Sequence, residues 1–127
     1  MDRQAQIDFI LEHYENPRHY GSLENPSVIQ KGGNPGCGDV VTFYLKVNGD
    51  DDRIEAISFE GDGCTISLAA SSLVTEMFTG KTLAEIEATP SEAILDILGR
   101  EIAGTRLKCA MLGLNTAKEA VRRLRQL

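Results

Sequence analysis

The sequence predicts an α+β fold, in which helices pack on one face of a small antiparallel sheet. A helical repeat of apolar residues comes first, over residues 3–15. Two segments with alternating apolar residues follow, 41–47 and 54–59, and from residue 64 onward the apolar spacing is again helical. A pair of strands followed by a run of helices is typical of α+β proteins, with the helices on one side of the sheet.

The first helix is expected to begin behind an Asp2 cap and to stop at Asn16-Pro17, because the residue before a proline disfavours helical geometry. From Asn16 to Gly36 the chain is rich in Gly, Pro, Asn and Ser and shows no sustained periodicity. This composition predicts a long loop that crosses the surface.

The alternation of the next two segments predicts a β-hairpin. Residues 48–52 between them have the sequence Asn-Gly-Asp-Asp-Asp, which favours a tight turn. The three aspartates lack the glycine and the distant glutamate of an EF-hand loop, so a solvated turn is favoured over a calcium site.

Helices are expected through most of the remaining chain. The first should end at Gly80, and two short helices should follow, each starting from a capping box: Thr82 with Glu85, and Thr89 with Glu92. The second short helix should end near Gly99, and a loop through Gly104 should lead to the last helix. That helix has an apolar side that runs from Met111 to Leu124.

Composition sets limits on the class of protein. The 127 residues are expected to form one domain, 1–127, and the formal net charge of −6, with scattered basic residues, argues against nucleic acid as a partner. No apolar run approaches the roughly 20 residues of a membrane span. The start, Met1-Asp2-Arg3, lacks the apolar stretch of a secretion signal. We therefore expect a cytoplasmic protein with no membrane partner.

The three cysteines suggest metal or sulfur chemistry, although buried free cysteines often serve only as small apolar residues. Cys37 lies in a loop between two glycines, where it is poorly placed for a core. Cys64 and Cys109 each open a helix, and a helix N-terminus favours the thiolate form, so both thiols should ionise readily. Thiolates are the ligands that zinc and iron–sulfur clusters require.

A fourth ligand is needed for a tetrahedral site, and Asp39 is the candidate. It follows Cys37 by two residues, so both side chains point the same way if the segment is extended. A carboxylate is a harder ligand than a thiolate, and the resulting weak bond would let a cluster leave readily. The alternative is that Asp39 only bonds to its own backbone in a turn.

Together, several motifs make the sequence resemble the IscU, NifU N-terminal and SufU family of iron–sulfur cluster assembly proteins. The resemblance covers nearly the whole chain and implies an α+β fold with Cys37, Asp39, Cys64 and Cys109 as ligands. Those ligands would hold a 2Fe-2S cluster, or zinc in the same site, with a cysteine desulfurase and apo iron–sulfur acceptor proteins as partners. The motifs are Tyr14-Glu15-Asn16-Pro17-Arg18, Gly36-Cys37-Gly38-Asp39, Gly61-Asp62-Gly63-Cys64 and Lys108-Cys109-Ala110-Met111-Leu112.

The sequence departs from both forms of this family. IscU proteins have histidine before the third cysteine, where this chain has Lys108, and a Leu-Pro-Pro-Val-Lys segment for a specialised Hsp70 chaperone. The equivalent stretch here is Ile102-Ala103-Gly104-Thr105-Arg106, which makes that partner doubtful. A basic residue before the third cysteine resembles SufU, but the long SufU insertion between the second and third cysteines is absent. The compact length favours the scaffold form.

Three functions remain open from the sequence. The first is a scaffold that builds a labile 2Fe-2S cluster and transfers it, which would not be an enzyme. The second is a zinc-dependent sulfur acceptor for a cysteine desulfurase, which would be a sulfurtransferase. The third is a structural zinc domain. A cysteine hydrolase is disfavoured, because His13 and His19 lie in or beside the first helix, where surface or packing roles are expected.

Overall fold

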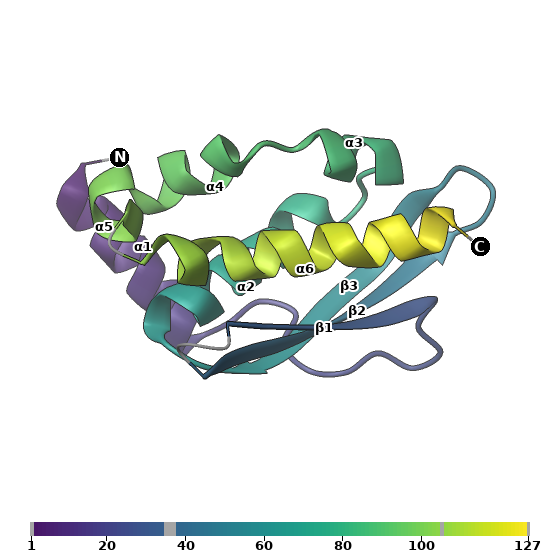
Figure 1. Ribbon diagram of the computed structural model, residues 1–127, viewed down its shortest axis with the longest axis horizontal. Helices are drawn as coiled ribbons and strands as arrows, with labels where there is room; N and C mark the ends of the chain where they lie inside the picture. Colours follow the sequence, from purple (N-terminus) through teal and green to yellow (C-terminus); the bar gives the residue numbers. More distant parts are fainter. Residues whose placement is uncertain (1, 35–37, 105, 127) are drawn as a thin grey trace.

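The computed structural model describes residues 2–34, 38–104 and 106–126. Helices and strands follow the order expected of an α+β chain, and Figure 1 shows their arrangement. The elements are α1 (Arg3–Glu15), β1 (Val28–Asn34), β2 (Asp39–Asn48), β3 (Arg53–Asp62), α2 (Thr65–Phe78), α3 (Leu83–Ala88), α4 (Ser91–Leu98), α5 (Arg100–Gly104) and α6 (Leu107–Arg125).

The three strands form one antiparallel sheet in the order β1-β2-β3. Strands β2 and β3 make the predicted hairpin, in register through pairs such as Phe43 with Phe59 and Leu45 with Ile57. A register shift between Lys46 and Val47 interrupts the pairing near the turn. The predicted hairpin and the α+β class are confirmed.

Strand β1 corrects the prediction of a loop throughout residues 16–36. Val28–Asn34 pairs with β2 along its whole length, from Val28 opposite Leu45 to Asn34 opposite Asp39. Glycines at 32 and 33 lower the β propensity of this segment, so its sequence alone indicated a loop. The structure shows why glycine is favoured at position 32, because a Cβ there would overlap the side chain of Thr116 on α6 unless the strand or the helix shifted.

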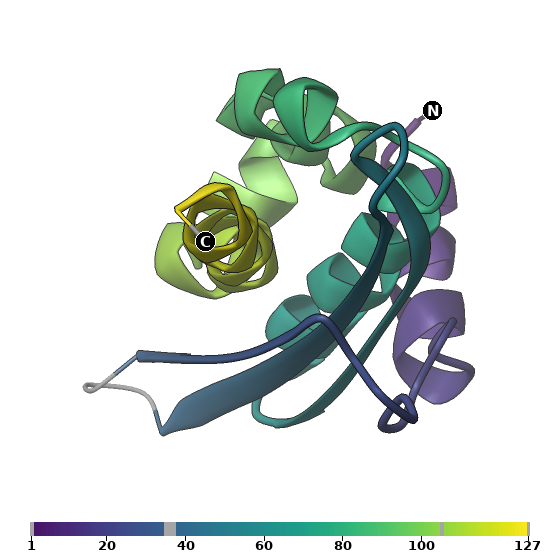
Figure 2. The same ribbon diagram turned by 90° about the vertical axis from the view of Figure 1, so that its right-hand side faces the viewer.

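The core lies between one face of the sheet and helices α2 and α6, and Figure 2 shows α6 on the concave side of the curved sheet. Alternate residues of β2 face this core, as the period of a strand requires. Helix α1 packs against α2. Large core residues include Phe43, Leu45, Phe59, Val74, Phe78, Leu114 and Val121.

Helix caps agree with the sequence at two of the three positions tested. The Asp2 carboxylate accepts a hydrogen bond from the Ala5 backbone N–H at 2.8 Å, and Thr82 and Glu85 form both bonds of a capping box. Thr89 does not cap α4, which begins after Pro90 with no side-chain cap. The Thr89 hydroxyl instead donates to the carbonyl of Glu85 at the end of α3.

Residues 100–104 were expected in a loop and instead form the short helix α5. Gly99 separates this helix from α4 and has a φ of 97°, in the region that favours glycine. The chain therefore turns at Gly99 and resumes helical geometry at once. No helix of the described residues is both long and apolar enough to cross a bilayer.

Both histidines belong to the attachment of the N-terminal segment to α2. His13 is buried, and its ring lies 4.4 Å from the Phe9 ring, centroid to centroid, at a tilted angle. Its Nδ1 lies 2.7 Å from the Ser72 hydroxyl and its Nε2 3.3 Å from the Glu76 carboxylate. His19 is exposed, and its Nδ1 lies 3.0 Å from the hydroxyl of Thr75. These are the packing and surface positions that the sequence led us to expect.

Candidate metal centre

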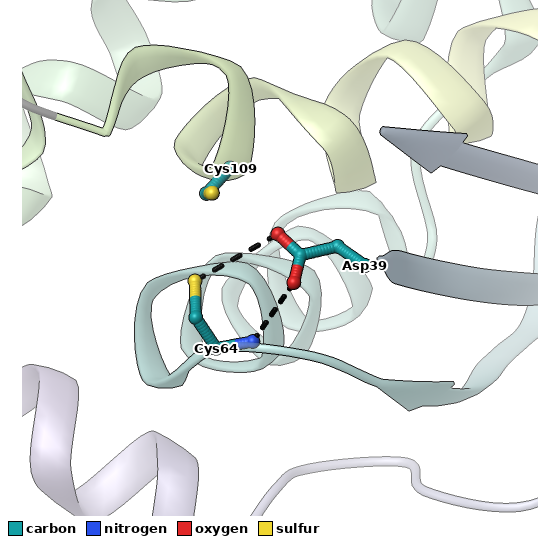
Figure 3. Close-up of side chains that lie close together, drawn as sticks. All are labelled: Asp39, Cys64 and Cys109. Carbon is teal, nitrogen blue, oxygen red and sulfur yellow. Dashed lines mark hydrogen bonds between the residues drawn. The ribbon is translucent and has the colours of Figure 1, made fainter. Parts of the chain in front are cut away.

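Three of the four residues singled out in the sequence come together at one end of the sheet. Asp39 is the first residue of β2, Cys64 immediately precedes α2, and Cys109 lies in the first turn of α6. Their ligand atoms all lie within 4.8 Å of one another. Figure 3 shows the three side chains turned toward a common centre. Cys37 lies outside the described residues, two positions before Asp39 in the sequence.

Cys64 occupies the N-cap position of α2, where serine, threonine, aspartate or asparagine is usual. Its sulfur accepts the backbone N–H of Ser67 at 3.5 Å. The sulfur therefore faces the positive end of the helix dipole. A close turn brings Cys64 here, because the chain passes from the end of β3 directly into α2.

The Asp39 carboxylate is held by the N-terminal end of α2. Its Oδ1 accepts the backbone N–H of Cys64 at 3.0 Å, and its Oδ2 accepts the hydroxyl of Ser67 at 2.8 Å. The Cys64 sulfur lies 3.8 Å from the same Oδ2. A Cβ at Gly63 would lie 2.6 Å from Oδ1, so this approach requires a glycine there. The alternative expectation was that Asp39 only bonds to its own backbone in a turn. The carboxylate instead accepts hydrogen bonds from Cys64 and Ser67.

These contacts decide the ionisation of Asp39. The side chain is only 3% exposed, and burial alone would raise its pKa. Hydrogen bonds from the Cys109 thiol, the Ser67 hydroxyl and the Cys64 N–H outweigh burial and lower the pKa of Asp39 below its ordinary value. The carboxyl group is therefore a carboxylate at neutral pH.

Cys109 differs from the sequence-based expectation of a readily ionised thiol. Burial first, and then the hydrogen bonds and negative charge of Asp39 and Cys64, raise the pKa of the Cys109 thiol to about 12. The helix N-terminus does not compensate for the neighbouring anionic groups. A bound cation would reverse the balance, because a metal deprotonates a coordinating thiol. The two cysteines and Asp39 together thus favour the binding of a cation between them.

Ser67 is a site residue that the sequence analysis missed. It is fully buried in the first turn of α2, and besides its bond to Asp39 its hydroxyl lies 3.5 Å from the backbone carbonyl of Cys109. The sequence did contain one indication of this role. Ser67 is three positions after Cys64, and residues with that spacing lie on the same face of a helix. Finding its partner required the fold, since Asp39 is 28 residues away.

Lys108 is exposed beside Cys109 and forms no ion pair with Asp39 in the described part of the chain. A groove of about 300 Å³ between β1 and α6 is lined by charged residues of both signs, Lys31, Lys108 and Glu119, and by Asn34, which pairs with Asp39. Lys108 is therefore exposed, whereas the neighbouring Cys109 and the Asp39 side chain are buried.

The donor set is suited to a soft or borderline cation. Two sulfurs and one carboxylate oxygen within 4.8 Å match the ligand types of zinc and of iron in iron–sulfur clusters. Cys37, two residues before Asp39 in the sequence, is a fourth residue of a type that binds these metals. The arrangement differs from zinc fingers, because each described ligand comes from a separate element.

Comparison with known proteins identifies the family. A family model described as the NifU-like N-terminal domain matches residues 5–126. This chain belongs to that family. The match confirms the resemblance that the cysteine motifs and the Tyr14–Arg18 segment indicated.

Curated relatives of the chain carry the name iron–sulfur cluster assembly scaffold protein IscU. The Archaeoglobus fulgidus protein IscU 1 is 38% identical over 114 residues, which cover 90% of this chain and 72% of that protein. The Escherichia coli K12 protein is 38% identical over 120 residues, covering 92% and 91% of the two chains.

Solved structures give the same fold. A SufU protein of Fervidobacterium islandicum AW-1, provisionally described as a cluster assembly scaffold of the SUF system, has a TM-score of 0.75 and 28% identity over 90% of this chain and 94% of its own. A NifU-like N-terminal protein from Brucella abortus has a TM-score of 0.81 over 95% and 98% of the two chains. At 21% identity, this second likeness concerns the fold alone.

Proposed function

We propose that this protein is a scaffold for iron–sulfur cluster assembly, which builds a labile 2Fe-2S cluster on Cys37, Asp39, Cys64 and Cys109 and transfers it to acceptor proteins. The observation that carries the proposal is the convergence of Asp39, Cys64 and Cys109 from three separate elements. The IscU relatives, which are scaffolds by name, support the same function.

The chemistry of the ligands supports both halves of this function. Cysteine thiolates bind iron strongly, and Cys64 and Cys109 both lie at the N-terminal ends of helices. The Asp39 carboxylate is a weaker ligand for iron in a sulfur environment. A site with one weak ligand can release its cargo when an acceptor thiolate arrives.

A cluster also needs sulfide, and we propose a cysteine desulfurase as its source. The sulfane sulfur of a desulfurase persulfide must gain two electrons from an added reductant to become sulfide. Apo iron–sulfur proteins are the proposed recipients, in the cytoplasm. A specialised Hsp70 chaperone stays doubtful, because residues 102–106 lack its recognition segment.

Anaerobic reconstitution tests the scaffold directly. Metal-free protein is incubated with ferrous iron, cysteine, a cysteine desulfurase and dithiothreitol, and the visible absorption and the iron and sulfide contents are measured. We expect a coloured cluster with two irons and two sulfides that passes to an apo-ferredoxin. Absence of a cluster under these conditions, or a cluster that no acceptor takes, would refute the proposal.

A zinc-dependent sulfur acceptor is the second candidate, favoured by Lys108 beside Cys109 and by the SufU structure. A cysteine thiolate of this chain would attack the terminal sulfur of the desulfurase persulfide, form a new S–S bond and release the desulfurase cysteine as a thiolate. Zinc-loaded protein would then increase desulfurase turnover and acquire a persulfide detectable by mass spectrometry. Unchanged turnover would exclude this function.

A further inference from the structure

The hydrogen bond between Ser67 and Asp39 affects how readily a metal bound at the site is released. The Ser67 hydroxyl donates to Oδ2, which is also the carboxylate oxygen beside the Cys64 sulfur. Oδ1 points instead to the Cys64 backbone N–H. Oδ2 is therefore the oxygen placed to bind a metal held by the cysteines, and Ser67 is its hydrogen-bond partner.

We propose that Ser67 is a positioning residue that makes Asp39 a detachable ligand. This inference deepens the proposed function and rests on the same site. A hydroxyl that donates to Oδ2 draws electron density from the oxygen and so weakens its bond to a metal. It also receives the carboxylate when that bond breaks, because a buried carboxylate without hydrogen bonds would be strongly disfavoured.

Both effects of Ser67 act in the same direction. When Oδ2 leaves the metal with its electron pair, the Ser67 hydroxyl and the Cys64 N–H already hold the carboxylate, and the vacated position is open to an incoming thiolate or chelator. Without the hydroxyl, Oδ2 would be more basic and its detachment more costly. Removal of the hydroxyl should therefore slow the release of metal.

The same helix supplies a matched control. Ser71 is one turn further along α2 and is also fully buried, and its hydroxyl has no hydrogen-bond partner among the described residues. Ser67→Ala and Ser71→Ala thus make the same chemical change in the same helix. Only the first change removes a bond to Asp39.

The experiment measures the release of zinc to a chromogenic chelator by stopped flow, with the full chain. Ser67→Ala should slow release by about tenfold, the size expected when a hydrogen bond to a charged group is lost, and Ser71→Ala should leave the rate unchanged. In an Asp39→Ala background, Ser67→Ala should have no effect, because a double-mutant cycle isolates the coupling of the two residues.

Several results would overturn the inference: release from Ser67→Ala as fast as from wild type or faster, an equal effect of Ser71→Ala, or an undiminished effect without Asp39. Wild-type protein that retains no zinc would also overturn it. Cluster reconstitution remains a separate measurement. Zinc kinetics as expected with no cluster formed would refute only the scaffold, whereas a transferred cluster with no Ser67 effect would refute only this inference.

Discussion

The Asp39 carboxylate accepts hydrogen bonds on both oxygens from one end of α2, although the residue itself begins a strand. This placement gives Asp39 a resting position beside the two sulfurs. It also adds a negative charge to a ligand set that is already anionic when the cysteines bind metal. Asp39 is therefore the residue on which transfer of a cluster should depend most.

Replacement of Asp39 by alanine should trap the cluster. In the wild type, a thiolate of the acceptor protein can first replace the weakly bound carboxylate on the cluster. The variant has no such ligand to replace, and the cluster is surrounded by one negative charge fewer. We expect transfer to an apo-ferredoxin to slow by about tenfold or more, equivalent to about 1.4 kcal/mol of activation free energy. Transfer rates followed by circular dichroism would check this, and transfer at the wild-type rate would contradict it.

Ser67→Ala should also lower the stability of the metal-free protein. The buried Asp39 carboxylate would lose one of its donors, at a cost of about 1–3 kcal/mol in the free energy of unfolding. Ser71→Ala, which removes a buried hydroxyl without a described partner, should cost much less or nothing. Urea denaturation of the two variants measures the difference, and equal losses would show that the Asp39 contact contributes no stability.

At this scale the sequence suggested Asp39, Cys64 and Cys109, which the fold brings together, from residue type and local motif, and Cys37 stays a prediction. Glycine-flanked Cys37 and the helix-start positions of Cys64 and Cys109 were visible in the sequence. The raised pKa of Cys109 was not, because it depends on the proximity of Asp39 and Cys64, which the chain brings together only in the fold. Ser67 was missed for the same reason.

At the scale of elements, the attachment of α1 to α2 depends on one buried histidine. Burial first, and then the positive charge of Arg18, lower the pKa of His13, while Glu76 and Glu12 raise it by less. The folded protein thus prefers neutral His13. The Ser72 hydroxyl, which also accepts the backbone N–H of Arg18 at 2.8 Å, faces its Nδ1.

The stability that His13 contributes should therefore depend on pH. Because its folded pKa lies below its unfolded value near 6.5, the contribution is complete above about pH 6.5 and declines as the pH falls toward the folded pKa. The slope cannot exceed about 1.4 kcal/mol per pH unit for one proton.

His13→Gln keeps a hydrogen-bonding side chain but does not titrate. Urea unfolding should be measured for the wild type and for this variant between pH 5 and 8. Below pH 6.5 the free energy of unfolding of the wild type should fall relative to that of the variant. A difference that stays constant over this range would mean that His13 does not titrate on unfolding.

Most elements were predictable because their apolar period is strong. The β2–β3 hairpin, α2 and α6 follow it closely. In α1 the apolar period is weak, since Leu11 and Tyr14 are exposed, and the Asp2 cap and the stop at Asn16 mark this helix instead. Strand β1 and helix α5 were not predicted, because the glycines at 32, 33 and 104 suggest loops. Strand β1 forms because it pairs with β2, and α5 forms where it packs beside α4. The predicted Thr89 cap was wrong, because that hydroxyl donates instead to the backbone carbonyl of Glu85 at the end of α3.

For the whole molecule, the candidate metal centre lies at one end of the apolar core, and Cys109 is itself buried there. The core between the sheet, α2 and α6 is continuous, and the ligands lie where β2, α2 and α6 begin. A continuous core favours folding without a metal, in contrast to a structural zinc domain, in which folding itself requires the metal.

Removal of metal should consequently leave the protein folded. We expect the far-ultraviolet circular dichroism to be nearly unchanged by a chelator and the melting temperature to fall, because a ligand that binds only the folded state stabilises it by mass action. The comparison of metal-loaded and chelated samples measures both. Loss of helical signal at room temperature would instead favour the structural zinc domain.

The close contact of Gly32 with Thr116 links the dimensions of the site to a position that carries no ligand. Strand β1 leads toward Asp39, and α6 carries Cys109, so the spacing of these two ligands depends on how near the helix comes to the strand. A methyl group at position 32 would act as a spacer between them. We therefore expect a substitution at position 32 to change the distance between the Asp39 and Cys109 side chains, although neither residue is altered.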